Sequence, residues 1–436
     1  MSGRGRRRFL RWPALALGSG SLVVVLAGLL AVLVSGAATA STHGTHDARL
    51  VGQFTMQGRI NVASHVYGEH PGQKVTRTWT FIPQCGHGVC KTVVLKRLRS
   101  SRGVLNKLTL TRQSAGVYSG KDSFHLALDC NGARIKSGGV ANETITVRIV
   151  RTVSIGGTRY ATGLTASYVN PSRYQYTKCP GDIGHDGAVY TGARTVRAIA
   201  STPSTGYFIL TADGGAFNFG AATSHGSDIG KLPFGQHAVG LAVDASTGGY
   251  WILRSNGAVN AFGAPAKGSL AGKLHNTYPT AIAADGSSGY LVLTADGGVH
   301  AFGNATWKGS AKGKLGKGVR AVSIAVAPSG GYWVLTSNGS VRGFGISARG
   351  SLKGKLKGKH PVDIVADPLG GYLILTGNGG VHPFGKAKWY GSSSGKLPHG
   401  VGAVSLAVDS STGGYWLLKS DDGVDHFHAP WKGSLR

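Results

Sequence analysis

The stretch GYWILRSNGAVNAFG at residues 249–263 recurs with small changes through the C-terminal half of the chain. Two other copies read GYLVLTADGGVHAFG at 289–303 and GYWVLTSNGSVRGFG at 331–345. The repeated tyrosine returns every 40 to 43 residues, at Tyr207, Tyr250, Tyr290, Tyr332, Tyr372 and Tyr415. A unit of this length cannot bury its own apolar face, so the six units must stack on one another.

Turn residues place the strands within each unit. An Asn-Gly or Asp-Gly pair separates two apolar runs in five units, which is typical of a tight hairpin. These pairs begin at Asp213, Asn256, Asp296, Asn338 and Asn378. The sixth unit reads Asp421-Asp422-Gly423, and we expect it to need a looser turn. A phenylalanine follows every repeat tyrosine by twelve residues, so the same strand position is aromatic in each copy.

The first two apolar runs of each unit lack polar alternation, as in AVSIAVA from Ala321 and YWVLT from Tyr332. Strands of this kind are buried on both faces, as happens where sheets stack between neighbouring sheets. Six units with four expected strands each predict a six-bladed β-propeller over residues 194–436, within an all-β chain. An open stack of hairpins is the alternative, although hairpin repeats of that type have a much shorter period.

These copies, each followed by Gly-Ser, resemble the GYW-(D/N)GG-FG repeats of exported actinobacterial proteins. The resemblance covers just over half of the chain. It implies a propeller-like module and an envelope or secreted location, and it names no substrate. The sixth unit departs from the pattern because His428, rather than glycine, follows Phe427, which indicates an atypical final blade.

The first 40 residues have the organisation of an export signal. Five arginines lie within residues 4–11, an apolar segment follows at 22–34, and a small-residue cleavage site occupies 38–40. The run RRRFLR also resembles a twin-arginine signal, so both export routes stay open. Without cleavage, residues 14–34 could form a transmembrane helix that anchors the chain, with the arginines on the cytoplasmic side. Either outcome places the following residues outside the cytoplasm.

Residues 41–180 lack the repeat and predict a separate β domain, either a barrel or a sandwich. Apolar runs begin at Arg77, Lys91, Lys107, Phe124, Glu143 and Arg159. The turn-rich segment 181–193 is expected to be a linker to the propeller. No amphipathic helix is expected in either part.

All four cysteines lie in this first domain, at Cys85, Cys90, Cys130 and Cys179. An even count in an exported chain favours disulfides, and we favour Cys85–Cys90 with Cys130–Cys179 among the three connectivities. A zinc site built from these thiols and His87 is the alternative, but the spacing lacks the paired cysteines of zinc ribbons. We therefore expect neither a metal nor another cofactor.

The chain is strongly basic, with 47 Lys and Arg against 18 Asp and Glu and a net charge of +29. Both domains share the excess, and residues 312–359 contain no acidic side chain. Five units carry a Gly-Lys-Leu sequence, which in a propeller would place five lysines on one face. The candidate anion-binding lysines are Lys231, Lys273, Lys314, Lys353, Lys355, Lys357, Lys359 and Lys396. Such a face could attract an anionic wall polymer, an acidic glycan, lipid head groups or extracellular DNA. The alternative is a merely solubilising surface. No motif for sequence-specific nucleic-acid binding occurs.

Catalytic motifs are missing or are explained by the repeat. The sequence GSSSG at 391–395 fits a nucleophile pattern, but it occupies the slot of GSLAG and GSLKG in other units. His426 and His428, beside Asp425, could share one strand face, yet exposed histidines are common in basic proteins. Trp307, Trp389 and Trp431 could stack on sugar rings or pack against the next blade.

These features predict an exported, non-catalytic protein that binds or scaffolds components of the cell envelope. Two alternatives stay open: a hydrolase or lyase with its site at the propeller mouth, and a module that binds a peptide or another protein.

Overall fold

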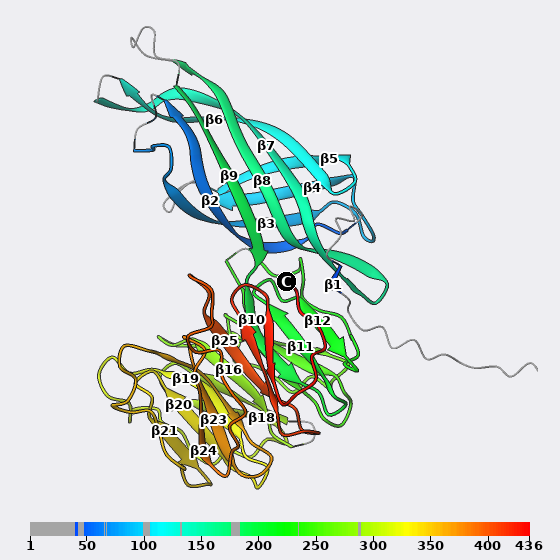
Figure 1. Cartoon of the computed structure of the whole chain (residues 1–436), viewed down its shortest axis with the longest axis vertical. Helices are drawn as coiled ribbons and strands as arrows, with labels where there is room; N and C mark the ends of the chain where they lie inside the picture. The colour runs from blue at the N-terminus through cyan, green and yellow to red at the C-terminus, as the bar shows by residue number, and fades with distance from the viewer. Residues whose placement is uncertain are drawn as a thin grey trace, which may run out of the picture. The chain divides into compact units, whose positions relative to one another are not determined.

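The computed structural model describes residues 40–41, 48–64, 66, 68–98, 105–130, 133–175, 184–233, 235–286 and 289–436. These residues belong to one compact unit, Gly36–Arg436. Each regular element within the described ranges is a β-strand, as Figure 1 shows. Accordingly, none of the described residues forms a helix with the length and apolarity needed to span a bilayer. The expected export signal lies outside the described residues.

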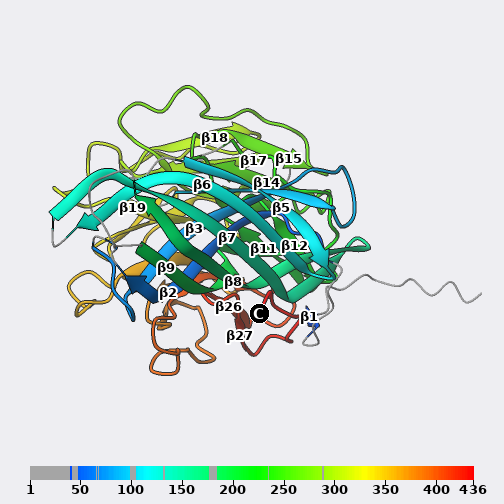
Figure 2. The same cartoon turned by 90° about the horizontal axis from the view of Figure 1, so that it is seen from above.

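The first module is a closed barrel of eight antiparallel strands. They are β2 (Gly52–Ser64), β3 (Lys74–Pro83), β4 (Thr92–Leu98), β5 (Leu105–Ser114), β6 (Val117–Cys130), β7 (Ala133–Ile155), β8 (Thr158–Gln175) and β9 (Gly184–Arg194). Each strand pairs with the next, and β9 also pairs with β2, which closes the barrel. Figure 2 shows the long strands β7 and β8 side by side. The short strand β1 (Ala40–Ser41) pairs with β7. A barrel is one of the two architectures expected from the sequence.

The prediction of a linker at residues 181–193 is wrong, because residues 184–193 belong to β9. This strand was hidden by its glycines, which resemble turn residues in the sequence. They are needed for close packing inside the barrel: a Cβ on Gly192 would lie only 2.4 Å from the Met56 sulfur. Strand β2 was missed for a similar reason, since Gly58 interrupts its alternating apolar residues.

The barrel core is apolar, and its large members include Phe54, Trp79, Phe81 and Tyr118. A disulfide joins Cys85 to Cys90 in the connection between β3 and β4, which confirms that pairing. The Arg49 guanidinium donates to the carbonyl oxygens of Cys85 and Gly88 and so holds this loop against the barrel. The side chain of Cys130 and the whole of Cys179 lie outside the described residues, so their expected pairing stays a prediction.

The second module contains six three-stranded antiparallel sheets. They are β10 (Val196–Ser201), β11 (Gly206–Thr211) and β12 (Ala216–Gly220); β13 (Ala238–Val243), β14 (Tyr250–Arg254) and β15 (Val259–Phe262); β16 (Pro279–Ala284), β17 (Gly289–Thr294) and β18 (Val299–Gly303); β19 (Ala321–Val326), β20 (Tyr332–Thr336) and β21 (Val341–Phe344); β22 (Pro361–Ala366), β23 (Gly371–Thr376) and β24 (Val381–Gly385); β25 (Ala403–Val408), β26 (Tyr415–Lys419) and β27 (Val424–Phe427).

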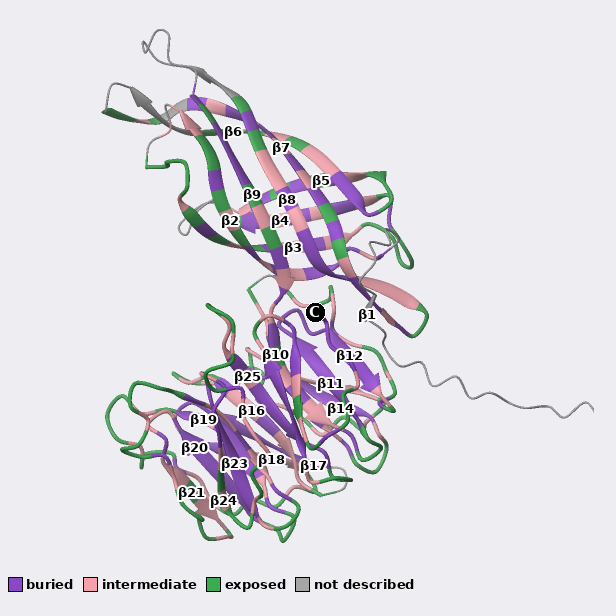
Figure 3. Ribbon diagram, viewed as in Figure 1, coloured by how far each residue is buried: buried purple, intermediate pink, exposed green. Residues whose placement is uncertain are grey.

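The sheets form a propeller-like ring. Their first strands contact one another in chain order, and β25 contacts β10. The second strands are almost wholly buried, as Figure 3 shows for β11, β17 and β20. This burial explains why both faces of these runs are apolar in the sequence.

The expected fourth strand is absent from each of the six described sheets. The segment after the third strand runs back irregularly and turns at its Gly-Ser. At Gly350 the backbone has a φ of +136°, and a Cβ there would lie 2.5 Å from the Phe384 ring. This conformation does not continue a strand, so the repeat length alone overestimates the number of strands.

The repeat aromatics join neighbouring sheets. Tyr372 pairs with Phe384 across two strands, and its hydroxyl donates to the carbonyl oxygen of Gly350 in the preceding unit. The same hydrogen bond occurs at the other five junctions, from Tyr207 to Gly433, Tyr250 to Gly226, Tyr290 to Gly268, Tyr332 to Gly309 and Tyr415 to Gly391. The twelve-residue spacing in the sequence therefore marks the contact between units.

The expectation of a looser turn in the sixth unit is also wrong. The Asp422 amide donates to the carbonyl oxygen of Lys419, as the Gly214 amide donates to the carbonyl oxygen of Thr211 in the first unit. Asp422 keeps this tight turn by adopting a φ of +70°, which other units assign to glycine. A left-handed aspartate is unfavourable relative to glycine.

Candidate functional site

Each sheet of the ring has two distinct ends. We call the end with the Asn-Gly or Asp-Gly turn the hairpin end, and the end at which the repeat tyrosine lies the tyrosine end. The irregular segment leaves the third strand at the tyrosine end and returns to the hairpin end.

Two hydrogen bonds fix the Gly-Lys-Leu loop at the hairpin end of its own sheet. In the fourth unit the Leu352 amide donates to the carbonyl oxygen of Gly339 in the turn, and the Lys355 amide donates to the carbonyl oxygen of Leu352. Equivalent bonds place Lys231, Lys273, Lys314 and Lys396. All five lysines are exposed, and Lys353, Lys357 and Lys359 lie exposed in and beside the loop of Lys355. The structure thus brings the sequence-predicted lysines to structurally equivalent positions.

Carboxylates at the hairpin end have other partners. Asp213 pairs with Arg194, Asp228 with Arg254, and Asp421 with Arg436. Lys312, beside the third Gly-Lys-Leu, pairs with Asp296 at 3.6 Å. Among the described residues, none of the five loop lysines has a carboxylate within ion-pair distance. Their charge is therefore available to an anion from solution.

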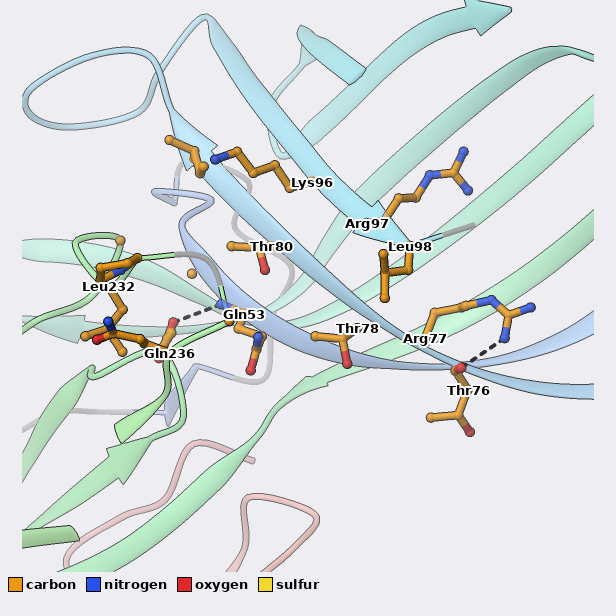
Figure 4. Close-up of a pocket in the computed structure, with 16 residues that line it drawn as sticks. Gln53, Thr76, Arg77, Thr78, Thr80, Lys96, Arg97, Leu98, Leu232 and Gln236 are labelled. Carbon is orange, nitrogen blue, oxygen red and sulfur yellow. Dashed lines mark hydrogen bonds between the residues drawn. The ribbon is translucent and has the colours of Figure 1, made fainter. Parts of the chain in front are cut away.

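A groove of about 490 Å³ lies where the loop of Lys231 faces the outside of the barrel. One wall consists of outward-facing residues of β3 and β4, and the other of Leu232, Pro233 and Gln236. Figure 4 shows Thr76, Thr78 and Thr80 in a row along β3. Sequence reasoning did not find this groove, since it combines residues more than 100 positions apart.

A buried arginine holds the two walls in place. Arg194 ends β9, and its guanidinium donates to Asp213 and to the carbonyl oxygens of Ala161 and Val51. It lies between the rings of Phe54 and Phe217, at 4.9 and 5.1 Å from their centroids. Asp213 also accepts a hydrogen bond from the backbone amide of Gln53, which is drawn in Figure 4. Burial lowers the pKa of Arg194, while Asp213 opposes that effect.

Asp422, with its left-handed backbone, lies at the same junction. Its side chain is fully buried, and Arg151 of the barrel approaches within 3.9 Å. Burial raises the pKa of this carboxyl to about 7, although Arg151 and Arg194 both act in the opposite direction. Neither carboxyl oxygen accepts a hydrogen bond within the described part of the chain.

The central channel has a volume of about 350 Å³ and is lined by the six first strands. Asp363 is the acidic residue among the lining residues, and no histidine is found among them. Its carboxylate accepts hydrogen bonds from Ser323, Ser405 and the amides of Ile364 and Leu406. Burial raises its pKa while these donors lower it. Asp363 thus joins three neighbouring strands, and no acid–histidine pair converges on the channel wall.

Three exposed tryptophans lie in the irregular segments that follow β18, β24 and β27. Trp307, Trp389 and Trp431 are 58%, 59% and 55% exposed, so they are not buried against a neighbouring sheet. The Trp307 indole donates to the Val299 carbonyl, which fixes its ring orientation. In contrast, the tryptophans that follow a repeat tyrosine are wholly or almost wholly buried, at Trp251, Trp333 and Trp416.

The remaining candidates have structural contacts. His428 stacks on Tyr390 at 4.4 Å, and His426 Nδ1 contacts the Ala429 carbonyl. Ser393 of the GSSSG sequence donates to Asp425, which also pairs with Lys419. Within the described ranges, no three His, Cys, Asp or Glu side chains come together as a metal site would require.

No protein-family model matches the chain, and no curated protein matches it. Among solved structures it is similar to YCF48 bound to D1 peptide, with 14% identity and a TM-score of 0.34 over 54% of this chain and 78% of that one. It is also similar to the extracellular domain of a putative hybrid two-component system, BT4673, from B. thetaiotaomicron, with 13% identity and a TM-score of 0.33 over 86% of this chain and 59% of that one. A BT4673 extracellular domain described as a putative one-component system has 11% identity and a TM-score of 0.33, over 84% of this chain and 77% of that one.

Proposed function

We propose that this chain is an exported, non-catalytic binding protein in which a six-bladed propeller presents a lysine face to anionic polymers of the cell envelope. The lysine face consists of Lys231, Lys273, Lys314, Lys355 and Lys396 together with Lys353, Lys357 and Lys359. One observation carries the proposal: the same two hydrogen bonds place the first five lysines at equivalent positions around one end of the ring.

Simple electrostatics favours an extended polyanion over a small ligand. At physiological salt, a charge is largely screened beyond roughly 8 Å, so a small anion is attracted only by the nearest ammonium groups. An extended anion can reach ammonium groups on several sheets and is attracted by each of them. A polymer can contact several such groups at once, and each contact adds to its binding free energy. Wall polymers with phosphate groups, acidic glycans and lipid head groups all supply this charge outside the cytoplasm.

The Cys85–Cys90 disulfide supports an extracytoplasmic location, since such bonds persist in oxidising compartments. Release after cleavage and anchoring through residues 14–34 are both compatible with this role. Anchoring would keep the protein at the outer surface of the membrane.

The channel favours binding over catalysis. A hydrolase or lyase at the propeller mouth needs an acid or base with a free lone pair or proton near its substrate. Both oxygens of Asp363 already accept hydrogen bonds from the protein, so this carboxylate acts as a structural tie between strands.

The test compares two variants with the same loss of charge. The first replaces Lys231, Lys273, Lys314, Lys355 and Lys396 with Gln. The control replaces five lysines of the tyrosine end, Lys267, Lys308, Lys386, Lys388 and Lys432, with Gln. We expect the first to elute from a heparin column at clearly lower salt, and the control to elute close to the wild type. Equal elution of the two variants would refute a specific lysine face.

A further inference from the structure

The Cys85–Cys90 disulfide has one exposed half and one buried half. Cys85 is exposed, and so are the four residues between the two cysteines. Cys90 is only 2% exposed and belongs to the barrel core, and its carbonyl oxygen accepts a hydrogen bond from the buried Tyr118 hydroxyl. Access decides which sulfur of a disulfide is attacked. A thiolate from outside therefore reaches the Cys85 sulfur more easily than the Cys90 sulfur.

An arginine side chain lies beside both sulfurs. Arg49 Nη1 is 3.7 Å from the Cys85 Sγ and 3.7 Å from the Cys90 Sγ. Within the described ranges, the other contacts of this guanidinium are the carbonyl oxygens of Cys85 and Gly88, and no carboxylate neutralises it. A positive charge next to a sulfur stabilises the thiolate relative to the thiol.

The position of Arg49 favours cleavage of the disulfide. When an external thiolate forms a bond to the Cys85 Sγ, the S–S bond breaks and its electron pair goes to the Cys90 Sγ. A sulfur that is stabilised as a thiolate leaves faster, and Arg49 supplies that stabilisation to the buried sulfur. The closed loop is also short, with a sequence separation of 5. A short loop adds less to folding stability than a long one, so less of that stability opposes reduction.

The fixed loop favours a partner with two thiols over a partner with one. Arg49 holds the loop through two carbonyl oxygens, so the freed Cys90 thiolate stays near the Cys85 sulfur and can expel a single thiol by re-forming the disulfide. A second thiolate on the partner competes with this return, because its attack is also intramolecular. It attacks the partner's own sulfur in the mixed disulfide, and Cys85 leaves as a thiolate. The exposed loop leaves room for a macromolecule to deliver both thiols.

We propose that the Cys85–Cys90 loop is a thiol–disulfide exchange site that oxidises a pair of thiols in another exported protein. The partner's two thiols lose two electrons and become a disulfide. Cys85 and Cys90 gain these electrons, together with the two protons that the partner's thiols release, and become thiols. Arg49 stabilises the thiolate that leaves in each step. This activity is separate from polymer binding and needs none of the lysines of the lysine face.

The experiment uses the full-length protein, with reduced thioredoxin as a probe that carries a pair of thiols. Samples are quenched with acid and alkylated, and the tryptic peptide 78–91, which contains both cysteines, is followed by mass spectrometry. Arg49→Met removes the charge, and Arg49→Lys keeps it. Arg59→Met, at an exposed arginine of β2, is the matched control. Reduced glutathione at the same thiol concentration provides the comparison with a single thiol.

We expect thioredoxin to reduce the wild-type disulfide and Arg49→Met to slow this reaction about tenfold, since a neighbouring charge shifts a titration by about one pH unit or more. Arg49→Lys should restore most of the rate, and Arg59→Met should match the wild type. Glutathione should be at least tenfold slower than thioredoxin.

A pH profile separates the charge of Arg49 from its structural contacts. In the reduced protein, iodoacetamide should label Cys85 at half its maximal rate at a pH below about 8.5, the value expected for a free cysteine. In Arg49→Met this pH should rise by about one unit. Loss of the carbonyl contacts alone would not produce this shift.

Two single variants test the direction of attack and do not depend on the folding of the Arg49 variants. Cys90→Ser leaves the exposed Cys85, and Cys85→Ser leaves the buried Cys90. We expect the first variant to form a mixed disulfide with oxidised glutathione at least tenfold faster than the second. Equal rates, or a faster reaction at Cys90, would overturn the proposed attack.

The other measurements can also overturn the inference. A wild-type disulfide that thioredoxin fails to reduce, or that glutathione reduces as fast, would exclude a site for paired thiols. Equal rates in the wild type and Arg49→Met would exclude a role for the guanidinium. An equal loss in Arg49→Met and Arg49→Lys would show that Arg49 only holds the loop in place.

Discussion

The hydroxyl of Tyr207 donates a hydrogen bond to the carbonyl oxygen of Gly433, 226 residues further along the chain. The same tyrosine–glycine bond joins consecutive units at the other five junctions, so the last unit contacts the first as an ordinary neighbour would. The Leu435 amide, which donates to Asp422, fixes the adjoining C-terminal residues. The ring is thus closed by its own repeated contact.

Removing the closing hydrogen bond should destabilise the protein without unfolding it. We expect Tyr207→Phe to lower the free energy of unfolding by about 1–2 kcal/mol, because it leaves a buried carbonyl unpaired. Urea denaturation followed by circular dichroism measures the change. Tyr278→Phe, at an exposed tyrosine, is the control and should differ little from the wild type.

Deleting residues 401–436 should expose the flank of a neighbouring sheet and cause aggregation. A soluble, folded product would argue for an open stack of units.

Asp422 should make stability depend on pH. Its folded-state pKa is raised to about 7 by burial, whereas an unfolded aspartate titrates near 4. Between these values the folded state binds the extra proton, so this residue lowers the free energy of unfolding progressively as pH rises from about 4 to about 7. Asp422→Asn should therefore be more stable than the wild type at pH 8, by on the order of 1 kcal/mol, and the difference should shrink towards pH 4.

Thermal melts across pH 4 to 8 test this relation. The control is Asp421→Asn, because Asp421 lies in the same turn and pairs with the exposed Arg436. Exposed pairs contribute little to stability. A stability difference for Asp422→Asn that does not vary with pH would contradict the expected titration.

The units of the ring were largely predictable because their contacts repeat locally. The spacing from Tyr250 to Phe262 sets a cross-strand pair, and the Asn-Gly at Asn256 sets the turn between them. Features that depend on distant residues were not predictable. Asp422 adopts a glycine conformation next to Arg151, which is over 270 positions earlier in the chain. The groove joins Thr78 to Gln236, and no local pattern in either segment indicates the other.

The Cys85–Cys90 disulfide should resist alkylation in the exported protein. Without reductant, thiol labelling under denaturing conditions should leave the peptide containing both cysteines unmodified in a mass spectrum. The closed loop is short, so its loss in a Cys85→Ser, Cys90→Ser variant should lower stability by only about 2 kcal/mol. Labelling of either cysteine in most molecules would contradict the disulfide.

The exposed tryptophans should report on sugar binding. Replacing Trp307, Trp389 and Trp431 with Ala should remove most of the fluorescence that acrylamide quenches, since Trp251, Trp333 and Trp416 are buried. If these rings stack on sugars, a neutral oligosaccharide should shift the wild-type emission and leave that of the variant unchanged. An unchanged wild-type spectrum would exclude stacking with the sugar tested.

The cluster beside Lys355 should contribute binding without contributing stability. Replacing Lys353, Lys355, Lys357 and Lys359 with Gln removes four exposed charges from a stretch that contains no carboxylate. Exposed lysines contribute little to folding, so the melting temperature should change little. Affinity for a polyanion such as heparin should fall, and the wild-type affinity should itself decrease steeply with salt, because screening weakens each contact. A matched variant, Lys308→Gln, Lys386→Gln, Lys388→Gln and Lys432→Gln, controls for net charge. If both variants elute at the wild-type salt concentration, this cluster is only a solvated surface, and the lysine face must act through the remaining units.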